Sequence, residues 1–375
     1  MTINKPTIGI DASRAFSAAP TGTEGYSYHL IRALLPQLDA QYQTRLYFRS
    51  APEPDAFPGA ESRIIPFPRL WTHVRLSWEM ARHPPDLLFV PAHVLPPVRP
   101  KRTLVTIHDL GYRYFPEAHP RRQRIYLDWS TRWNARIASH ILADSHATQD
   151  ALAREYGIPA PKITVAYPGY DSHLAPVRDA DVLAAVQARY AIPGPYILFI
   201  GRLQPRKNLV RLIEAFAHLA PERPNLWLVL AGPTGWLAEP IHARVRELGL
   251  EERVLFPGYV VEADKAALLS GAQLFAYLSL YEGFGFPALE AQACGVPLLV
   301  SNTSSLPEVV GDGGLLVDPL DTSAITAGLA RLLDDVMLRR TLIALGSVNL
   351  RRFSWETTAR TVLTVIENLL NTPSV

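Results

Sequence analysis

Short apolar runs alternate with amphipathic segments along the whole chain. In the first half the runs are "TIGID", "RLYFRS", "DLLFVP", "TLVTIHD", "HILADS" and "ITVAYPG". In the second half they are "YILFIG", "LWLVLAG", "RVLFPGY", "LFAYLS", "PLLVSN" and "GLLVD". These runs are apolar almost throughout, which is typical of parallel strands that are covered on both faces. The pattern therefore predicts an α/β protein with parallel sheets.

The segments between these runs have the period of amphipathic helices. In "NLVRLIEAFAHLA", Leu209, Leu212, Ile213 and Phe216 form one apolar stripe. Repeated strand–helix units predict a doubly wound sheet of the Rossmann type. The pattern restarts after the charged segment "VRDADVLAAVQARYAIPGP", so we expect two such domains facing each other across a cleft. We assign 1–175 to the first domain and 176–350 to the second, and 351–375 to a final helix that packs back on the first.

The composition narrows the class of protein. A chain of 375 residues exceeds one ordinary core, which agrees with two domains. The formal net charge of +2 gives no reason to expect nucleic-acid binding. The single cysteine, Cys294, excludes an internal disulfide and a multi-cysteine metal site. Neither a signal peptide nor an apolar stretch of about 20 residues is evident, so we expect a cytoplasmic protein.

The first candidate site is the loop "GRLQPRKN". In open α/β sheets, ligands bind beyond the carboxyl ends of the strands, so we expect the binding residues in the loops that follow strands. Arg202 and Lys207 lie between a strand that ends at Gly201 and a helix that starts near Asn208. A planar guanidinium and a compact ammonium at a helix entrance can hold a diphosphate, with help from the free helix N–H groups. A solvated basic loop is the alternative.

The second candidate is "YEGFGFPALEAQACG", where two carboxylates flank a glycine-rich turn. Gly283 and Gly285 allow a ligand close to the main chain, and Pro287 suits the first helical residue. Sugar hydroxyls donate to carboxylates, so Glu282 and Glu290 can hold a hexose and a ribose. A nicotinamide fold, with Glu308 on the ribose, is a rival interpretation. It is weakened because that fingerprint normally opens the first strand–helix–strand unit of a fold.

These segments resemble the retaining glycosyltransferases of family 4, and within it a mannosyltransferase-like branch of surface polysaccharide assembly. The resemblance rests on "GRLQPRKNL", "FPGYV", "EGFGFPALEAQACGVPLLVSN" and "SSLPEVVGDGGLLVDP", with "TIHDL" and "DASR…TGTEGY" in the first half. It implies a GT-B fold and transfer of a hexose from a nucleoside-diphosphate sugar to a glycan or a lipid-linked glycan. GDP-mannose is the first expectation for the donor. No cofactor is expected.

The resemblance also implies a role for each matching residue. Arg202 and Lys207 would hold the donor diphosphate as it leaves. Glu290 would bind the ribose and Glu282 the transferred sugar. The remaining donor-site residues would be Gly283, Phe284 and Gly285 against the sugar, and Val260, Glu262 and Lys265 beside the base.

The first domain contributes two expectations. The resemblance places His108 beside the sugar at the reaction centre and brings the loop Gly22–Gly25 to the phosphates and the acceptor. That loop has Thr23 and Glu24 where the family often has adjacent glycines. From the sequence itself, His108 ends a strand next to Asp109, which could orient the imidazole. A purely structural histidine is the alternative.

We expect no metal, because no His/Cys/Asp cluster has the spacing of ligands. Arg202 and Lys207 would do the electrostatic work of a divalent ion.

Two stretches mix arginine with aromatic residues: "RLWTHVRLSWEMAR" and "RRQRIYLDWSTRWNARI". They predict either core-facing aromatics with solvated arginines, or a surface for a lipid-linked acceptor and an anionic membrane. Two other functional classes also stay open. One is a nucleotide-sugar epimerase or phosphorylase of the same architecture, and the other is a catalytically silent nucleotide-sugar binder.

Overall fold

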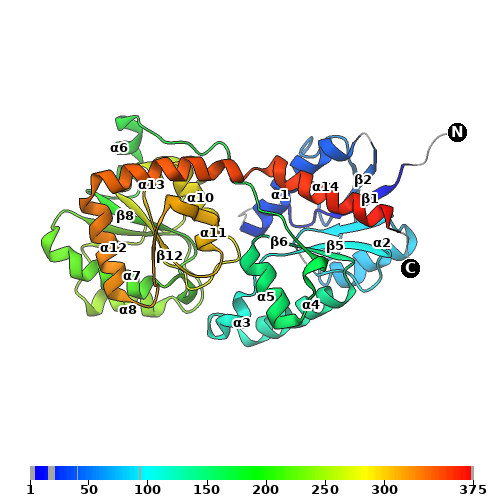
Figure 1. The fold of residues 1–375 in the computed structure, drawn as a ribbon, viewed down its shortest axis with the longest axis horizontal. Helices are drawn as coiled ribbons and strands as arrows, with labels where there is room; N and C mark the ends of the chain where they lie inside the picture. The colour runs from blue at the N-terminus through cyan, green and yellow to red at the C-terminus, as the bar shows by residue number, and fades with distance from the viewer. Residues whose placement is uncertain (1–4, 16–21, 40, 93, 373–375) are drawn as a thin grey trace. The chain divides into compact units, whose positions relative to one another are not determined.

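The computed structural model describes residues 5–15, 22–39, 41–92 and 94–372 (Figure 1). Contacts divide the chain into two compact units. The first comprises Met1–Arg113, Arg121–Gly169 and Phe353–Val375, and the second comprises Tyr114–Pro120 and Tyr170–Arg352. The sequence predicts the boundaries between the two domains after residues 175 and 350, and the structure has them after Gly169 and Arg352. The C-terminal segment belongs to the first unit, as predicted.

The described residues of the first unit form a seven-stranded parallel sheet in the order β3-β2-β1-β4-β5-β6-β7. Six of these strands coincide with predicted apolar runs, and only β3 was not predicted. β3 is a polar edge strand whose residues alternate between half-buried and exposed, so its sequence lacks the apolar run of a covered strand. The strands are β1 (Thr7–Asp11), β2 (Gln43–Phe48), β3 (Glu61–Ile64), β4 (Leu87–Val90), β5 (Arg102–Ile107), β6 (His140–Ala143) and β7 (Ile163–Val165).

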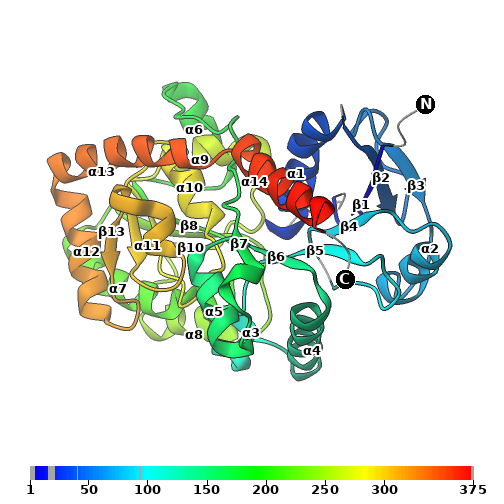
Figure 2. The same ribbon diagram turned by 45° about the vertical axis from the view of Figure 1, so that its right-hand side comes forward.

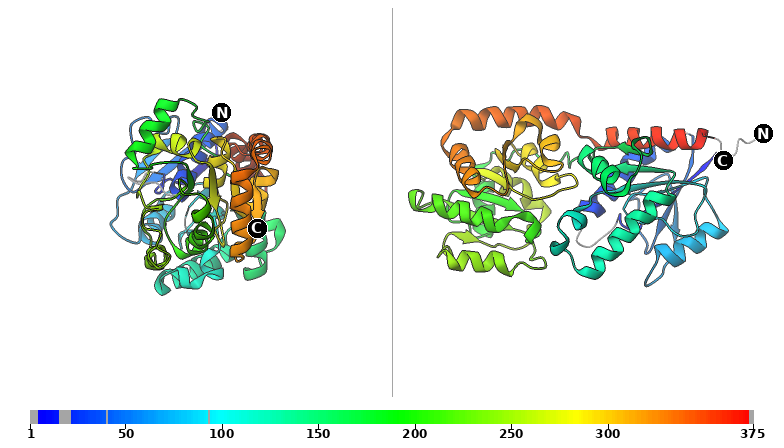
Figure 3. Two further views of the ribbon diagram at one scale, coloured as in Figure 1. Left: turned by 90° about the vertical axis from the view of Figure 1, so that its left-hand side faces the viewer. Right: turned by 60° about the horizontal axis from the view of Figure 1, so that its bottom comes forward.

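Helices cover both faces of this sheet. On one face α1 and α14 lie side by side, and their apolar stripes share one buried core with β1 and β2 (Figure 1). Figure 3 shows α4 on the opposite side of the sheet from α14. Ser354 begins α14 because its hydroxyl accepts the backbone N–H of Thr357, a standard N-cap. The helices are α1 (Gly22–Leu38), α2 (Ser77–Arg82), α3 (Gly111–Tyr114), α4 (Arg121–Ile137), α5 (His146–Tyr156) and α14 (Trp355–Asn371).

The described residues of the second unit form a six-stranded parallel sheet in the order β10-β9-β8-β11-β12-β13. All six strands fall within predicted runs. They are β8 (Tyr196–Ile200), β9 (Trp227–Ala231), β10 (Val254–Leu255), β11 (Leu274–Tyr277), β12 (Leu298–Ser301) and β13 (Leu315–Val317).

Two layers of helices enclose the second sheet. Figure 2 shows α9, α10 and α13 above the strands and α7 and α8 below them. The predicted stripe of α7 is buried: Leu209, Leu212, Ile213 and Phe216 are at most 1% exposed. The helices are α6 (Ala180–Arg189), α7 (Leu209–Leu219), α8 (Glu239–Glu247), α9 (Glu262–Ser270), α10 (Phe286–Ala293), α11 (Leu306–Val310), α12 (Thr322–Asp334) and α13 (Val336–Asn349).

Strand order reverses once in each sheet, between β1 and β4 and between β8 and β11. At such a reversal the loops that follow the two adjacent strands diverge and leave a crevice between them. Open α/β sheets bind their ligands in this crevice. In the second unit this position lies between the loop that contains Lys207 and the loop that contains Glu282.

One predicted loop is wrong. Gly22–Gly25, which we expected to be a loop, form the first turn of α1, and Glu24 accepts a hydrogen bond from Arg14 at 3.0 Å. Residues 16–21, which precede this segment, lie outside the described residues. Within the described part of the chain, no helix is long and apolar enough to cross a membrane.

Candidate active site

Lys207 and Glu282 form the centre of the candidate site in the second unit. Lys207 ends a short 3-10 turn after β8, and Glu282 follows β11. Lys207 Nζ lies 2.5 Å from Glu282 Oε1, and it also donates to Tyr277 Oη at 2.9 Å. The two charged side chains are each only 9% exposed. A buried ammonium and carboxylate at this distance form a charge-assisted hydrogen bond.

Arg206 completes this cluster from the other side. Its guanidinium lies 3.0 Å from Glu282 Oε2 and also donates to the carbonyl of Tyr281. Burial by itself would raise the pKa of Glu282, but the positive charges of Arg206 and Lys207 outweigh it and lower the pKa to about 2. Glu282 is therefore held ionised between two cations.

Arg202 does not join this cluster. Its side chain is exposed, and its guanidinium makes no hydrogen bond or ion pair with any residue that the structure describes. The stem of Arg202 lies along Gly235, where an added Cβ would come within 3.0 Å of its Cγ. The structure thus separates the two predicted cations. Lys207 is fixed and buried, and Arg202 lies at the surface of the same loop.

The turn that carries Glu282 is braced by two serines that follow β12. Ser304 Oγ accepts the backbone N–H of Glu282 at 3.0 Å, and Ser305 Oγ donates to the carbonyl of Phe284 at 2.6 Å. Gly285 has φ +122°, and an added Cβ would lie 2.7 Å from Leu306. The turn therefore requires glycine at this position for both conformational and steric reasons.

A second cluster joins three of the other predicted donor-site residues. Lys265 Nζ lies 2.7 Å from Glu262 and 3.3 Å from Glu290. Burial raises the pKa of Glu290, and the positive charge of Lys265 partly counteracts this. Val260 is buried in the core, 6% exposed. Helix α10 begins at Phe286, one residue before the expected start at Pro287, and Glu290 is its fifth residue.

His108 lies in the first unit, and its partner is not the predicted one. Nδ1 lies 2.6 Å from Asp144 Oδ2, and Nε2 lies 2.9 Å from the carbonyl of Pro91. Asp109 instead accepts the backbone N–H of Gly111 at 2.8 Å. Because both ring nitrogens face acceptors, the imidazolium is the form that this geometry favours. Burial lowers the pKa of His108, but the carboxylate of Asp144 raises it above the usual value.

Sequence reasoning missed Arg206, Ser304 and Ser305. The motif "PRKN" contains two adjacent cations, and a spacing argument gave no reason to prefer Arg206 over Arg202. The serines lie inside a quoted segment, "SSLPEVVGDGG", but their partners lie on a different loop of the sheet. Within the described ranges, no group of three His, Cys, Asp or Glu side chains could hold a metal ion.

The two units match two known sequence families. Residues 188–346 match Glycosyl transferases group 1, and residues 20–174 match Glycosyltransferase Family 4. The O-antigen chain mannosyltransferase B of Escherichia coli is 34% identical over 302 residues, which cover 80% of this chain and 79% of that protein. A D-inositol 3-phosphate glycosyltransferase of Streptomyces bingchenggensis is 33% identical over 234 residues, which cover 59% of this chain and 51% of that protein.

Solved structures share the fold across nearly the whole chain. Anabaena HepE in complex with UDP and glucose superposes with a TM-score of 0.74 at 20% identity, covering 97% of this chain and 99% of that one. WaaG, a glycosyltransferase involved in lipopolysaccharide biosynthesis, superposes with a TM-score of 0.72 at 15% identity, covering 96% of this chain and 99% of that one.

Two parallel α/β sheets with these structural neighbours define the GT-B fold. The chain belongs to glycosyltransferase family 4, the glycosyl transferases group 1, and mannosyltransferases are among its relatives. The predicted fold class and family are confirmed.

Proposed function

We propose that this protein is a retaining, metal-independent mannosyltransferase that uses GDP-mannose to extend a surface glycan. The observation that carries the proposal is the buried cluster of Arg206, Lys207 and Glu282 at the strand reversal of the second sheet. These three side chains carry two positive charges and one negative charge. They therefore favour an anionic ligand group such as the diphosphate of a nucleotide sugar.

The remaining donor contacts follow from the two clusters. Arg202, at the surface of the same loop as Lys207, provides a second phosphate ligand. Glu290 is held by Lys265 with a carboxylate suited to the ribose hydroxyls, and Val260 and Glu262 border the base. Glu282 accepts from a hydroxyl of the transferred sugar, and the turn Gly283–Gly285 places main-chain groups near that sugar.

In the proposed reaction, the bond between the sugar's anomeric carbon and the diphosphate breaks. The acceptor oxygen attacks the same carbon from the same face, and its proton passes to the departing phosphate oxygen. The anomeric configuration is therefore retained. The work of the protein is electrostatic: Lys207 and Arg202 stabilise negative charge as it develops on the leaving phosphate. The same two cations replace a divalent metal, and no cofactor is needed.

The identity of sugar and acceptor is supported by the relatives. The Escherichia coli protein with 34% identity is named an O-antigen chain mannosyltransferase, and others are named serotype-specific mannosyltransferases. We therefore propose mannose as the transferred hexose and a hydroxyl of an O-antigen-like chain, free or lipid-linked, as the acceptor.

We also propose that the first unit contacts an anionic membrane. Trp78 is 55% exposed and Trp129 is 45% exposed, on α2 and α4. His73 connects the two stretches, because its ring lies 5.8 Å from that of Trp129. Not every predicted aromatic faces solvent: Trp71 is buried and donates to the carbonyl of Ile65. The two stretches also carry exposed arginines, and the guanidinium of Arg82 lies over the ring of Trp78. The exposed arginines are Arg69, Arg82, Arg121, Arg122 and Arg132.

Exposed tryptophan among arginines suits an interface with anionic lipid. Sedimentation with vesicles that contain phosphatidylglycerol tests this at low salt. Wild type is expected to bind, and a Trp78→Ser/Trp129→Ser variant is expected to bind more weakly. Absence of binding by wild type would refute membrane contact but not the transferase activity.

A direct assay tests the central proposal. Purified protein is incubated with GDP-mannose and a mannose-terminated oligosaccharide, with EDTA present, and GDP and extended glycan are quantified. We expect GDP release that depends on acceptor, and a product with the donor's anomeric configuration by NMR. A thermal-shift screen of nucleoside diphosphates and their sugars identifies the preferred donor, because a ligand of the folded state raises its melting temperature. If no nucleotide sugar shifts the melting temperature and no transfer occurs, the proposal is wrong.

A further inference from the structure

The segment 177–190, which contains α6, is bound to both ends of α9. The two helices pack against each other (Figure 2). At the end of α9, Ser270 Oγ accepts the backbone N–H of Val177, which precedes α6, at 3.0 Å. At the start of α9, the backbone N–H of Val261 donates to the hydroxyl of Tyr190, which follows α6, at 3.3 Å. The segment therefore holds α9 at two points.

A buried carboxylate strengthens the attachment at the start of α9. Asp264 lies in the first turn of α9, and its side chain is only 6% exposed. Its Oδ1 accepts from Arg189 at 2.5 Å, and its Oδ2 accepts from the hydroxyl of Tyr190 at 2.9 Å. A buried charge without partners is strongly unfavourable. These two donors therefore fix the position of Asp264 and of the helical turn that carries it.

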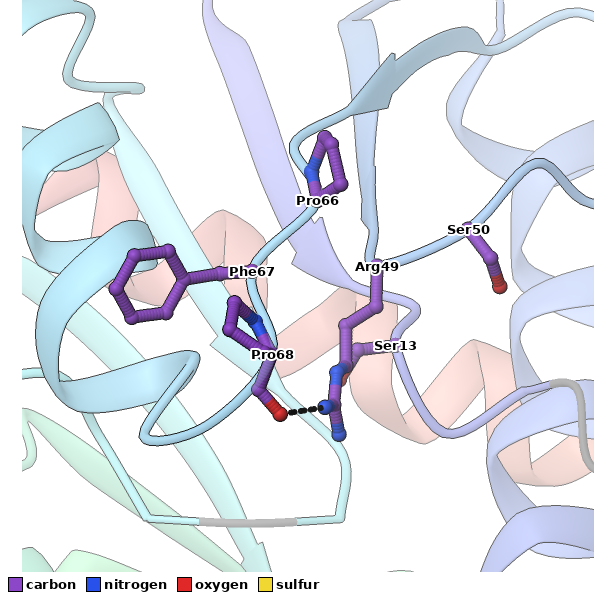
Figure 4. Close-up of a pocket in the computed structure, with 6 residues that line it drawn as sticks. All are labelled: Ser13, Arg49, Ser50, Pro66, Phe67 and Pro68. Carbon is purple, nitrogen blue, oxygen red and sulfur yellow. Dashed lines mark hydrogen bonds between the residues drawn. The ribbon is translucent and has the colours of Figure 1, made fainter.

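An arginine of the first unit shows a weaker kind of attachment. Figure 4 shows Arg49 beside an open pocket, where its guanidinium donates to the carbonyl of Pro68 at 3.2 Å. Both residues are exposed, so water can take the place of this donor. The carboxylate of Asp264 is buried, and water replaces its partners less readily. Loss of Arg189 should therefore disturb its surroundings more than loss of Arg49.

The turn that contains Asp264 also carries two residues that we propose to border the base. Glu262 lies two positions before Asp264 on α9, and Lys265 follows it directly. Lys265 Nζ in turn lies 3.3 Å from Glu290, the proposed ribose ligand. A shift of this turn would therefore displace the base contacts and the partner of Glu290 together. Lys207, which we propose to hold the diphosphate, lies on a different loop, after β8.

We propose that Asp264 is a positioning residue for the nucleoside half of the donor, and that Arg189 and Tyr190 hold it in place. Asp264 acts through Glu262 and Lys265 rather than by contact with the nucleotide. This inference rests on the proposed function, because it takes those two residues as neighbours of the base. It adds α6 to the donor site: the affinity for a nucleoside diphosphate depends on the attachment of α6 to the start of α9.

Two variants at the end of α6 test the positioning role. Tyr190→Phe removes only the hydroxyl beside Asp264, and Arg189→Gln removes the positive charge. Arg246→Gln on α8 is the matched control. That arginine is 56% exposed, close to the 59% of Arg189, but its partner Glu239 is exposed as well. Calorimetric melts verify that the variants fold. GDP is the probe in calorimetric titrations, and GDP-mannose is the donor in transfer assays.

We expect Tyr190→Phe and Arg189→Gln to raise the Kd for GDP and the KM for GDP-mannose about fivefold, the effect of losing about one hydrogen bond. The kcat should stay close to that of wild type, because Lys207 and Glu282 are unchanged. Arg246→Gln should match wild type in all three quantities. A purely structural role would lower the melting temperature and leave the Kd for GDP unchanged, and this result would overturn the proposal. A lower kcat with an unchanged KM would overturn it too.

A double-mutant cycle tests the route through Lys265. Lys265→Ala should weaken GDP binding by itself. Adding Tyr190→Phe should then have little further effect, because both changes act on the same contact. Added to Lys207→Ala, Tyr190→Phe should keep its full effect, because the diphosphate is held by a different loop. Additive effects of Tyr190→Phe and Lys265→Ala would contradict the proposed route.

Failure of the proposed function has a separate signature. If no nucleoside diphosphate shifts the melting temperature of wild type, the donor site itself is wrong and this inference falls with it. If wild type binds GDP and the variants of Arg189 and Tyr190 bind it equally well, the donor site stands and only the positioning role is refuted.

Discussion

Lys207 and Glu282 lie 2.5 Å apart although 75 positions separate them in the sequence. Their contact follows from strand order: β8 and β11 are hydrogen-bonded neighbours, so the loops at their carboxyl ends meet. Three strands (β9, β10 and β11) and three α-helices (α7, α8 and α9) lie between these loops in the chain without separating them in space. The parallel sheet thus brings together a cation and an acid that belong to different sequence motifs.

Lys207→Ala is expected to lower kcat/KM for mannosyl transfer by about 100-fold. The reason is loss of one preorganised positive charge at the leaving diphosphate, about 3 kcal/mol of barrier. Steady-state release of GDP in the presence of acceptor measures the effect. Lys101→Ala, at an exposed position in the first unit, is the control and should keep full activity. A fully active Lys207→Ala would contradict the assigned role.

Arg206 and Arg202 are expected to differ in the pH dependence of activity. Arg206 forms an ion pair with Glu282, and its positive charge lowers the pKa of that carboxyl group. Arg206→Ala removes this charge, so the effect of burial should raise the pKa of Glu282. The acidic limb of the kcat/KM profile should then move to higher pH. Arg206→Lys should restore much of the wild-type profile. Arg202→Ala, which does not touch Glu282, should weaken donor binding without moving the acidic limb. Equal shifts in both alanine variants would refute the distinction.

The acid stability of the protein should depend on Glu282. Its pKa is lowered in the folded protein from 4.5 to about 2. A carboxyl group whose pKa is lower in the folded than in the unfolded protein stabilises the fold at pH values above its unfolded pKa. This contribution, about 3 kcal/mol, is lost as the pH falls through the pKa of the folded protein. At neutral pH, Glu282→Gln should therefore melt at a lower temperature than wild type. Between about pH 5 and about pH 3, its melting temperature should change less than that of wild type.

Calorimetric melts over this pH range make the measurement. Glu222→Gln is the control, because that side chain is 81% exposed and should leave the profile unchanged. A Glu282→Gln profile parallel to that of wild type would show that Glu282 does not titrate as described.

Asp144 should set the protonation of His108. In Asp144→Asn the opposing carboxylate is gone, burial dominates, and the pKa of His108 should fall below its usual value. NMR titration of the His108 ring protons, assigned with a His108→Gln variant, measures this. Asp109→Asn should lower the pKa less, because Asp109 acts on His108 only through a weaker charge interaction. A larger effect from Asp109 would reverse this assignment.

The local pattern of the chain predicted the fold closely. Twelve apolar runs correspond to β1, β2 and β4–β13, because a strand covered on both faces must be apolar along its whole length. The edge strand β3 has no such requirement, and its residues "ESRI" therefore carried no signal. The first turn of α1 was also missed, because glycine and threonine at Gly22–Gly25 are typical of loops as well as of helix starts.

The sequence by itself determined the parallel α/β architecture and the motifs that contain Lys207, Glu282 and Glu290, because these depend on residues close together in the chain. Only the tertiary structure decided the partners: Arg206 on Glu282, Asp144 rather than Asp109 on His108, and Lys265 between Glu262 and Glu290. The physical reason is that an ion pair depends on distance in space. Strand order, not separation along the chain, sets that distance.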